Sequence, residues 1–275
     1  MLRLLLPGPS ARVNLFELYS REVRQPGDRP FVRVNMVSTL DGAVAFAGRS
    51  GHIGGATDRL LFSVLRSLAD VVLVGAGTVR AERYGPVKLP AEAQQMRLQS
   101  GQGSVPTIAV VTRSGVIDWE SPLFAEGAPR PIVITTAGTA TRVRTKGGAR
   151  ADVVSAGTET VDLAVALRAL GERRLARVLC EGGPALNSGL AAAQLIDELC
   201  LTLSPKLAGW TGPGPLSGWM GREIWPASGA VGGASSVQPQ PLPELLELQL
   251  AHVLEDDGSL FLRLRAGYRT GSPEA

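Results

Sequence analysis

Hydrophobic residues occur in short runs along the chain, separated by stretches with helical spacing or by glycine-containing turns. Seven runs rich in valine, isoleucine and leucine are typical of strands that are buried on both faces of a sheet. They occupy residues 31–38, 70–75, 107–112, 131–136, 151–156, 176–183 and 197–205. Several connections between them are long enough for crossover helices, so the pattern predicts an α/β domain with a mostly parallel central sheet flanked by helices.

Three stretches have the spacing of helices. In the clearest, residues 57–69, we expect Thr57 to be the N-cap and Asp58 to lie in the first turn. Its apolar stripe consists of Leu60, Leu61, Val64, Leu65 and Leu68. We expect two more helices at residues 158–170 and 184–193, the second of which begins with proline at its first position.

The C-terminal region has a different pattern, in which apolar and polar residues alternate. Residues 244–268 predict two strands joined by a turn at Asp256-Asp257-Gly258. We expect this antiparallel hairpin to form an edge of the sheet. Residues 208–243, which are rich in glycine, proline and serine, are interpreted as a surface excursion.

Composition limits the classes of partner. The chain has 275 residues, of which 44% are hydrophobic and 19% charged, and its net charge of +3 contains no long block of one sign. This balance argues against nucleic-acid binding. No apolar run approaches the roughly 18 residues of a membrane span, and prolines interrupt the apolar start of the chain too early for a secretory signal. We therefore expect a cytoplasmic protein with no membrane partner.

Few residue types for metal or covalent chemistry are present. The two histidines and the two cysteines, Cys180 and Cys200, have no metal-site spacing, and neither a G-x-S-x-G nor a Walker motif occurs. The cysteines end apolar runs and are interpreted as buried thiols. We expect no metal. The inventory favours a cofactor that carries its own reactive carbon, which the protein binds and orients.

Ligands of open α/β sheets bind beyond the carboxyl ends of the strands, so the residues that follow each run are candidates. Four such motifs are "STLDG" (38–42), "GAGTVRAERYG" (75–85), "TRSG" (112–115) and "EGGPALNSG" (181–189). In the last, Gly182 and Gly183 precede a helix N-terminus, which offers free N–H groups to a phosphate. The alternative is that the two glycines only form a tight turn.

Two dehydrogenase interpretations fail on local grounds. "GAGTVR" begins like a dinucleotide fingerprint, but Arg80 occupies the position of the third glycine. Tyr84 precedes Lys88 by four residues, yet Gly85 and Pro86 between them disfavour the helix that would bring the two side chains together. We interpret that spacing as chance.

Taken in order, "STLDG", "SGHIGGATDRLLFSVLRSLADVVLVGAGTV", "VVTRSG" and "VLCEGGPALNSGLAAAQLIDELCLTLSPKLAG" resemble the reductase family that forms the C-terminal half of the bacterial bifunctional deaminase-reductase of riboflavin biosynthesis. The resemblance covers about residues 31–209. It implies a dihydrofolate-reductase-like α/β fold, NADPH as hydride donor, a homodimer, and reduction of the ribosylamino side chain of a phosphorylated pyrimidine. We expect an N-terminal extension over residues 1–30 and a single reductase domain over 31–275, since no domain linker is evident.

The resemblance assigns roles to individual positions. Cofactor contacts fall on Val37, His52, Thr78, Glu82, Thr112, Arg113, Ser114, Gly182, Gly183, Pro184, Ala185, Leu186 and Asn187. Substrate contacts fall on Ser50, Arg66 and Glu181. A cation with two hydroxyls at 112–114 suits the 2′-phosphate of NADPH, although a surface arginine in a turn is the alternative. Arg66 also lies on the polar side of its helix, where a solvated arginine is an alternative.

Asp41 and Glu181 are the catalytic candidates. Asp41 ends a strand in a motif that resembles a nicotinamide-site turn, so we expect it to orient the substrate or relay a proton while Gly42 admits the cofactor. A plain Asp-Gly turn is the alternative. Glu181 is expected to hydrogen-bond the substrate. Hydride transfer needs no protein nucleophile, so positioning is the main task.

The segment "RAERYGPVKLP" (80–90) departs from the family pattern, which carries an acidic pair, a proline and a threonine-arginine end that grips the substrate phosphate. Glu82 replaces the first acid, whereas Pro86 and Leu89 occupy substrate positions. Lys88 or Arg83 is a candidate to replace the arginine with which the family binds the substrate phosphate. The chain also has no zinc-deaminase signature. A dihydropterin reductase and a non-catalytic NADPH-binding protein therefore remain alternatives to a pyrimidine reductase.

Overall fold

The computed structural model describes residues 2–10, 13–20, 29–125, 129–209 and 245–267. Its strands are β1 (Arg3–Leu6), β2 (Phe31–Thr39), β3 (Val71–Gly75), β4 (Thr107–Val111), β5 (Ile132–Thr135), β6 (Asp152–Ser155), β7 (Arg177–Cys180), β8 (Glu198–Ser204), β9 (Leu248–Asp256) and β10 (Ser259–Ala266). Its α-helices are α1 (Leu15–Ser20), α2 (Ala56–Leu68), α3 (Ala76–Glu82), α4 (Ala91–Gln99), α5 (Ala137–Gly147), α6 (Leu163–Gly171) and α7 (Pro184–Ala192). All seven predicted strands are confirmed.

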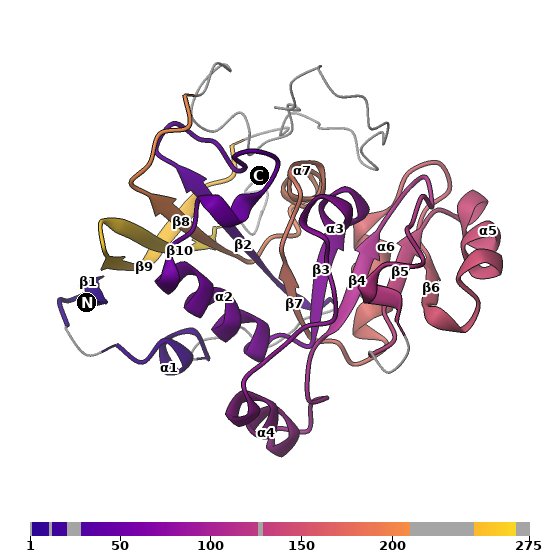
Figure 1. Cartoon of the computed structure of the whole chain (residues 1–275), viewed down its shortest axis with the longest axis horizontal. Helices are drawn as coiled ribbons and strands as arrows, with labels where there is room; N and C mark the ends of the chain where they lie inside the picture. The colour runs from indigo at the N-terminus through magenta and orange to yellow at the C-terminus, as the bar shows by residue number, and fades with distance from the viewer. Residues whose placement is uncertain (1, 11–12, 21–28, 126–128, 210–244, 268–275) are drawn as a thin grey trace, which may run out of the picture.

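The strands form one sheet in the order β1-β9-β10-β8-β2-β7-β3-β4-β5-β6 (Figure 1). The pairs from β8 to β6 are parallel, and β8-β10, β10-β9 and β9-β1 are antiparallel. The mostly parallel sheet with a C-terminal antiparallel hairpin is therefore confirmed. The expectation that this hairpin forms an edge of the sheet is wrong. The outer side of β9 pairs with β1, which is the edge strand.

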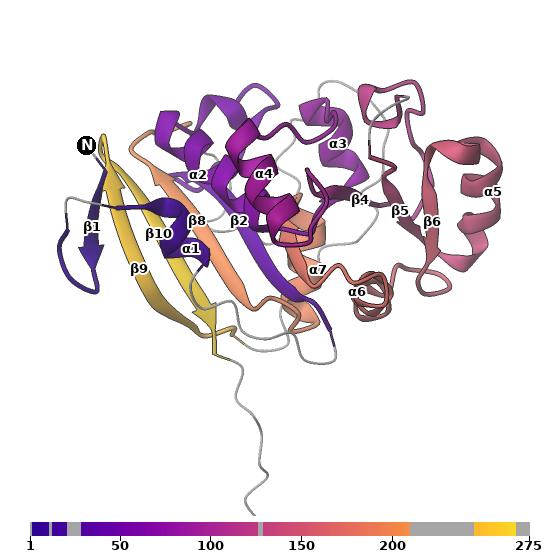
Figure 2. The ribbon, with the colours of Figure 1, turned by 90° about the horizontal axis from the view of Figure 1, so that it is seen from below.

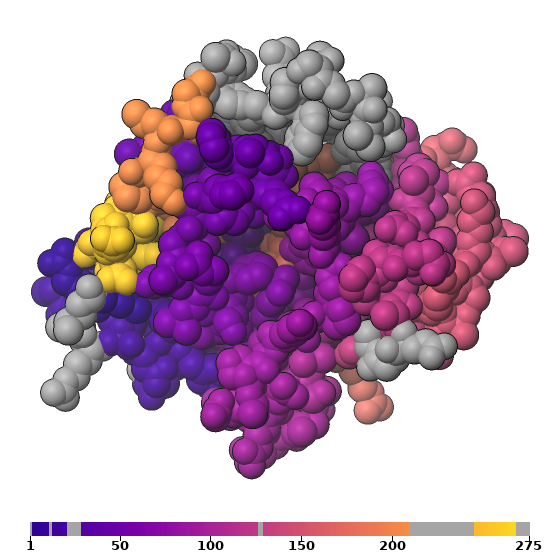
Figure 3. Space-filling model, viewed as in Figure 1, coloured from indigo at the N-terminus to yellow at the C-terminus, as the bar shows by residue number. Residues whose placement is uncertain are grey.

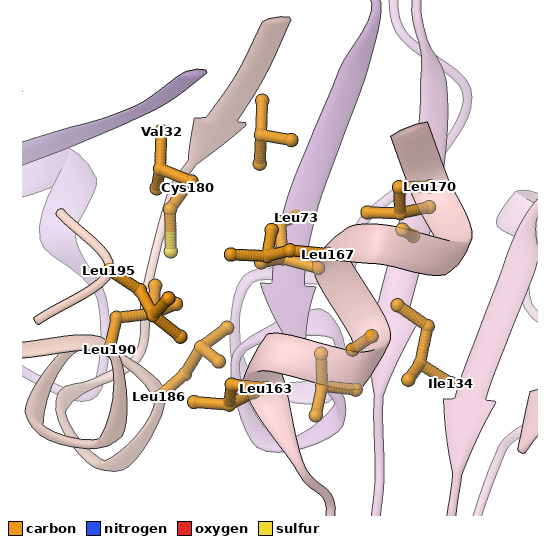
Figure 4. Packing of buried hydrophobic residues seen from close by; sticks show 14 of the residues in the cluster. Val32, Leu73, Ile134, Leu163, Leu167, Leu170, Cys180, Leu186, Leu190 and Leu195 are labelled. Atoms are coloured by element: carbon orange, nitrogen blue, oxygen red, sulfur yellow. The ribbon is translucent and has the colours of Figure 1, made fainter. Parts of the chain in front are cut away.

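Helices cover both faces of the parallel strands, which explains why these strands are apolar on both sides. Figure 2 shows α2, α3 and α4 on one face and α6 and α7 on the other. On the second face Leu163, Leu167 and Leu170 of α6 pack against the sheet, near Leu73 and Ile134 (Figure 4). Alternate residues of β3 therefore belong to two different hydrophobic clusters, one for each face.

The N-termini of α2 and α6 differ from the predictions, because other residues than expected cap these helices. Gly55, not Thr57, is the N-cap of α2, and the Thr57 hydroxyl donates to Asp256 Oδ2 at 2.5 Å. Helix α6 begins at Leu163 rather than at residue 158, because the Asp162 side chain accepts the N–H of Val165 and caps the helix there. Helix α7 begins at Pro184 as predicted.

The described N-terminal residues pack onto the sheet. Tyr19 of α1 is completely buried in a cluster shared with α2. The last carbonyls of α1 accept hydrogen bonds from two buried guanidiniums, Arg263 to Leu18 O at 2.9 Å and Arg33 to Tyr19 O at 3.2 Å. Both arginines also pair with Glu198, which is 1% exposed. This ionic cluster joins α1 to three strands of the sheet.

The C-terminal hairpin turns as its sequence predicts. Asp257 and Gly258 have φ values of 50° and 74°, the left-handed pair that a two-residue hairpin turn requires. Of the predicted excursion at 208–243, residues 210–243 lie outside the described residues. Within the described part of the chain, no helix has both the length and the apolar character needed to cross a lipid bilayer.

Candidate active site

A topological switch point lies between the neighbouring strands β3 and β7. Helix α3 follows β3 onto one face of the sheet, whereas α7 follows β7 onto the other. Crevices at such points, outside the carboxyl ends of the strands, are the ligand sites of open α/β sheets. Figure 3 shows a hollow between α2 and α3 on the face that carries both helices.

The two turns beyond β3 and β7 are in direct contact. The Gly75 N–H donates to Gly182 O at 2.8 Å. A Cβ atom at Gly183 would lie 2.7 Å from the Thr78 hydroxyl oxygen. Two predicted cofactor contacts, Thr78 and the Gly182-Gly183 pair, therefore lie side by side. We call this arrangement the cradle. Thr78 lies in the first turn of α3.

The start of α7 offers main-chain donors to this cradle. Gly182 has φ +81°, a conformation that favours glycine, and Gly183 is the N-cap before Pro184. The N–H groups of Ala185 and Leu186 lie in the first turn, where an α-helix supplies no acceptor. Among the predicted contacts, the Leu186 side chain belongs to the core, so only its main chain can meet a ligand.

Asn187, another predicted cofactor contact, is turned inward. It is 2% exposed, donates from Nδ2 to Met36 Sδ at 3.1 Å and accepts from the Cys180 thiol at 3.4 Å. Burial raises the pKa of the Cys180 thiol to about 12, so this thiol is not a nucleophile at neutral pH. Asn187 therefore supports the turn from below, through side chains of β2 and β7.

The "STLDG" motif forms a turn, and its carboxylate also reaches a distant segment. Gly42 has φ +86°, and its N–H donates to Thr39 O at 3.0 Å. Asp41 accepts hydrogen bonds from the Thr39 hydroxyl at 2.5 Å, from Ala208 N at 3.0 Å and from Gly209 N at 2.9 Å. Its carboxylate thus holds the chain that follows β8.

A short helix-like segment at residues 50–52 lies beside the same region. The carbonyls of His52 and Ile53 accept from Lys206 Nζ at 2.9 and 2.8 Å. Ser50 donates to Glu82 Oε1 from both its N–H, at 2.8 Å, and its hydroxyl, at 2.9 Å. Ser50 and Glu82, predicted to contact different ligands, therefore bind each other. The His52 side chain is exposed.

Val37, the remaining predicted cofactor contact on β2, is partly buried. It lies in register with Thr202 and on the same side of the strand as Thr39. That side is the face covered by α2, because Arg33, four positions earlier, donates there to Tyr19 O of α1, whereas Val34 and Met36 face the opposite cluster. Val37 therefore lies on the face of the sheet that carries α2.

The "TRSG" motif closes its own turn at the end of β4. The Thr112 hydroxyl accepts from Gly115 N at 3.0 Å, and Thr112 is 1% exposed. Ser114 is exposed and Arg113 is partly exposed. No hydrogen bond of the Arg113 guanidinium occurs within the described residues. Arg113 and Ser114 are thus the members of this motif that face solvent.

Arg66 and Glu181, both predicted to contact substrate, form an ion pair. Arg66 Nε and Nη2 donate to the two carboxylate oxygens of Glu181, each at 2.7 Å. The Tyr84 hydroxyl donates to Glu181 Oε2, also at 2.7 Å. Burial, and then the negative charge of Glu181, raise the pKa of the Tyr84 phenol well above its ordinary value. Arg66 is therefore not a solvated surface arginine.

Tyr84 is the functional candidate that sequence reasoning missed. Its spacing from Lys88 was interpreted as chance, and residues 84–88 are indeed not helical. The sequence signal for Tyr84 is its position in segment 80–90, which departs from the family pattern next to expected substrate contacts. In the same segment Val87 and Leu89 are buried in the core, whereas Arg83 and Lys88 are exposed. Leu89 consequently contributes packing at a position where the resemblance implies a substrate contact.

No three histidine, cysteine, aspartate or glutamate side chains gather as metal ligands among the described residues.

A family model, the RibD C-terminal domain, matches residues 30–221. A 2,5-diamino-6-ribosylamino-4(3H)-pyrimidinone 5′-phosphate reductase of Methanothermobacter thermautotrophicus is 30% identical over 181 residues, 66% of this chain and 80% of the relative. A protein of the same name from Archaeoglobus fulgidus is 28% identical over 182 residues, 66% of this chain and 83% of the relative.

Among solved structures, a pyrimidine reductase-like protein of Corynebacterium diphtheriae superposes with a TM-score of 0.70 at 27% sequence identity. The alignment covers 87% of this chain and 92% of that protein. This likeness confirms the expected dihydrofolate-reductase-like α/β fold.

Proposed function

Because the chain belongs to the RibD C-terminal domain family, an oxidoreductase family of riboflavin biosynthesis, we propose that it transfers hydride from NADPH to a phosphorylated ribosylamino-pyrimidine. The names of the two archaeal relatives support this substrate class. The product would carry a ribitylamino side chain in place of the ribosylamino one. Two pyrimidines of this class are candidates: the 2,5-diamino-pyrimidinone named for the relatives and the corresponding 5-aminouracil.

The contact between the β3–α3 and β7–α7 turns is the observation that carries the proposal. At Gly183 there is no room for a side chain beside Thr78, and the first turn of α7 presents main-chain N–H groups there. These features fit a pyrophosphate held at a helix N-terminus. Thr78, Gly182, Gly183 and the main chain of Ala185 would hold the dinucleotide, which supplies the hydride when bound.

Arg113 and Ser114 would distinguish NADPH from NADH. Both lie beyond β4, next to β3 in the sheet, and a guanidinium with a hydroxyl is well suited to a phosphate dianion. We expect Arg113→Ala to raise the dissociation constant of NADPH about tenfold while leaving that of NADH unchanged. Arg144→Ala, in the exposed last turn of α5, is the matched control. An equal loss for both cofactors would contradict the assignment.

Asp41 would act by holding the chain at the mouth of the site. Its carboxylate fastens residues 208–209, and Lys206 fastens the same segment to His52 and Ile53. We expect Asp41→Asn to lower kcat more than the affinity for NADPH, because an amide cannot accept all of these hydrogen bonds. The control is Asp118→Asn, on an exposed turn. An unchanged kcat would remove Asp41 from the mechanism.

The test of the whole proposal is NADPH oxidation by the purified protein, followed by absorbance. Both phosphoribosylamino-pyrimidines and dihydrofolate are offered separately. Turnover of either pyrimidine supports the proposal. Turnover of dihydrofolate alone would instead assign a dihydropterin substrate, which the altered segment 80–90 favours. NADPH binding without turnover of any of the three would indicate a non-catalytic binding protein.

We further propose that the protein is a homodimer. On the face of β8 and β10 opposite α2, Leu201, Leu203, Leu260 and Leu262 are only partly buried and lie in register as cross-strand neighbours. A second copy packed on this apolar face would bury it. We expect a dimer by light scattering and a monomer for Leu262→Arg. Leu98→Arg, at an exposed position of α4, should stay dimeric; a monomeric wild type would refute the proposal.

A further inference from the structure

Tyr84, Glu181 and Arg66 come from three separate parts of the fold. Arg66 lies in the last turn of α2, Glu181 directly follows β7, and Tyr84 follows α3. The Glu181 N–H donates to Leu73 O at 3.0 Å, which fixes its main chain at the carboxyl end of β3. The cluster therefore lies one residue before the Gly182-Gly183 turn of the proposed cofactor cradle.

The carboxylate of Glu181 uses most of its acceptor capacity within this cluster. Its side chain is 2% exposed and accepts three hydrogen bonds of 2.7 Å, two from Arg66 and one from Tyr84. Three of the roughly four lone-pair directions of the carboxylate are therefore used within the cluster, and the remaining one, on Oε1, is buried with the side chain. A direct contact between Glu181 and the substrate stays a prediction.

Arg66, in contrast, keeps donors available. Within the described residues its Nη1 atom makes no hydrogen bond, and 18% of its side chain is exposed. The guanidinium lies 4.0 Å from the ring centroid of Phe62 and 5.7 Å from that of Tyr84. Two aromatic rings and a bidentate carboxylate therefore fix its plane, and its free edge is the part that can meet an anionic or oxygen-rich ligand.

Tyr84 has one hydroxyl proton, and it is donated to Glu181. That proton is unavailable to a substrate, so Tyr84 is not a general acid. We infer that Tyr84 is a substrate-positioning residue: by hydrogen-bonding Glu181 it holds Arg66 with its free Nη1 edge toward the crevice, where it binds the phosphorylated, hydroxyl-rich side chain of the substrate. This inference rests on the proposed function and adds a residue from the departing segment to the substrate site.

The test begins with Tyr84→Phe, which removes the hydroxyl and keeps the ring beside Arg66. We expect the KM for the pyrimidine to rise about tenfold, the size of one hydrogen bond to a charged group. The kcat should change less than about threefold, and the NADPH dissociation constant should be unchanged. Between pH 6 and 9 the kcat profile should keep its shape, because Tyr84 donates its proton to Glu181 and not to the substrate.

Tyr19→Phe provides the matched control. Its phenol is also buried, and its hydroxyl has no partner within the described residues. The residue lies on α1, packed against the opposite end of β2 from Asp41. The same chemical change there should leave KM, kcat and NADPH binding unchanged. A similar rise in KM for both variants would show a general effect on folding and would overturn the inference.

A double mutant tests whether Tyr84 acts through Arg66. Arg66→Lys keeps the charge but loses the planar fork, so we expect a larger rise in KM than for Tyr84→Phe. If Tyr84 only positions Arg66, adding Tyr84→Phe to Arg66→Lys should raise KM no further. Additive effects, or a fall in kcat without a change in KM, would overturn the positioning role.

Binding measured without turnover separates this inference from the proposed function. The pyrimidine is titrated calorimetrically into protein saturated with NADP⁺, which cannot donate hydride. About tenfold weaker binding to Tyr84→Phe than to wild type supports the inference, whether or not hydride transfer is detected. Equal binding overturns the inference and leaves the proposed function standing. No binding or turnover of either pyrimidine by wild type overturns both.

Discussion

Replacing Gly183 with alanine tests the cradle with a single added methyl group. The Gly183 φ of −67° lies within the range of alanine, and the added Cβ is the change that meets Thr78. That Cβ would lie 2.7 Å from the Thr78 hydroxyl oxygen, closer than such atoms approach. Because Gly183, the N-cap of α7, and the first turn of α3 both directly follow strands of the sheet, we expect the Thr78 side chain to move.

The magnitude follows from that displacement. Forcing the Thr78 side chain away from its rotamer costs roughly 0.5–1.5 kcal/mol. Losing its hydrogen bond to a cofactor costs roughly another 0.5–1.5 kcal/mol. We expect a net loss of about 1–3 kcal/mol in binding, or a roughly five- to 150-fold higher dissociation constant for NADPH.

The assay is NADPH fluorescence titration, with thermal unfolding as a check on folding. Gly138→Ala is the control, because Gly138 is the second residue of α5 and a Cβ there meets nothing within 4 Å. It should bind NADPH like wild type. A dissociation constant for Gly183→Ala within about twofold of wild type would refute the cradle, since the clash would then have no consequence for the ligand.

Three further predictions concern the buried groups. Glu198→Gln leaves two buried arginines without their shared carboxylate, so chemical denaturation should show a free energy of unfolding lower by about 3–5 kcal/mol. The control Asp152→Asn, in an exposed ion pair, should lower it by less than about 1 kcal/mol. Equal losses for the two variants would contradict the argument. Cys180 and Cys200 should react with a thiol reagent at pH 8 only after unfolding, because burial raises the pKa of both thiols. Burial also raises the pKa of Tyr19 above its ordinary 10.0, so its contribution to stability is complete below pH 10 and is lost above it; Tyr19→Phe should show a smaller alkaline loss than wild type.

Local sequence determined most of the sheet. The seven apolar runs became strands because residues buried on both faces leave a continuous hydrophobic signature that tertiary context does not alter. Pro184 and Asp257-Gly258 likewise marked a helix start and a hairpin turn, since both depend on backbone preferences of the residues themselves. The order of the four motifs was also sufficient to indicate the family.

Contacts between distant residues were decided only by the tertiary structure. Tyr84 meets Glu181 across 97 positions, Arg66 meets it across 115, and Asp41 binds Ala208 across 167. No local pattern encodes such pairs, because a polar residue at the end of a strand has the same sequence signature whether it faces solvent, a ligand or another segment. The sequence therefore determined which strands carry the site, and the folding of the chain determined that Glu181 binds Arg66 and Tyr84 and that Asp41 holds the chain after β8.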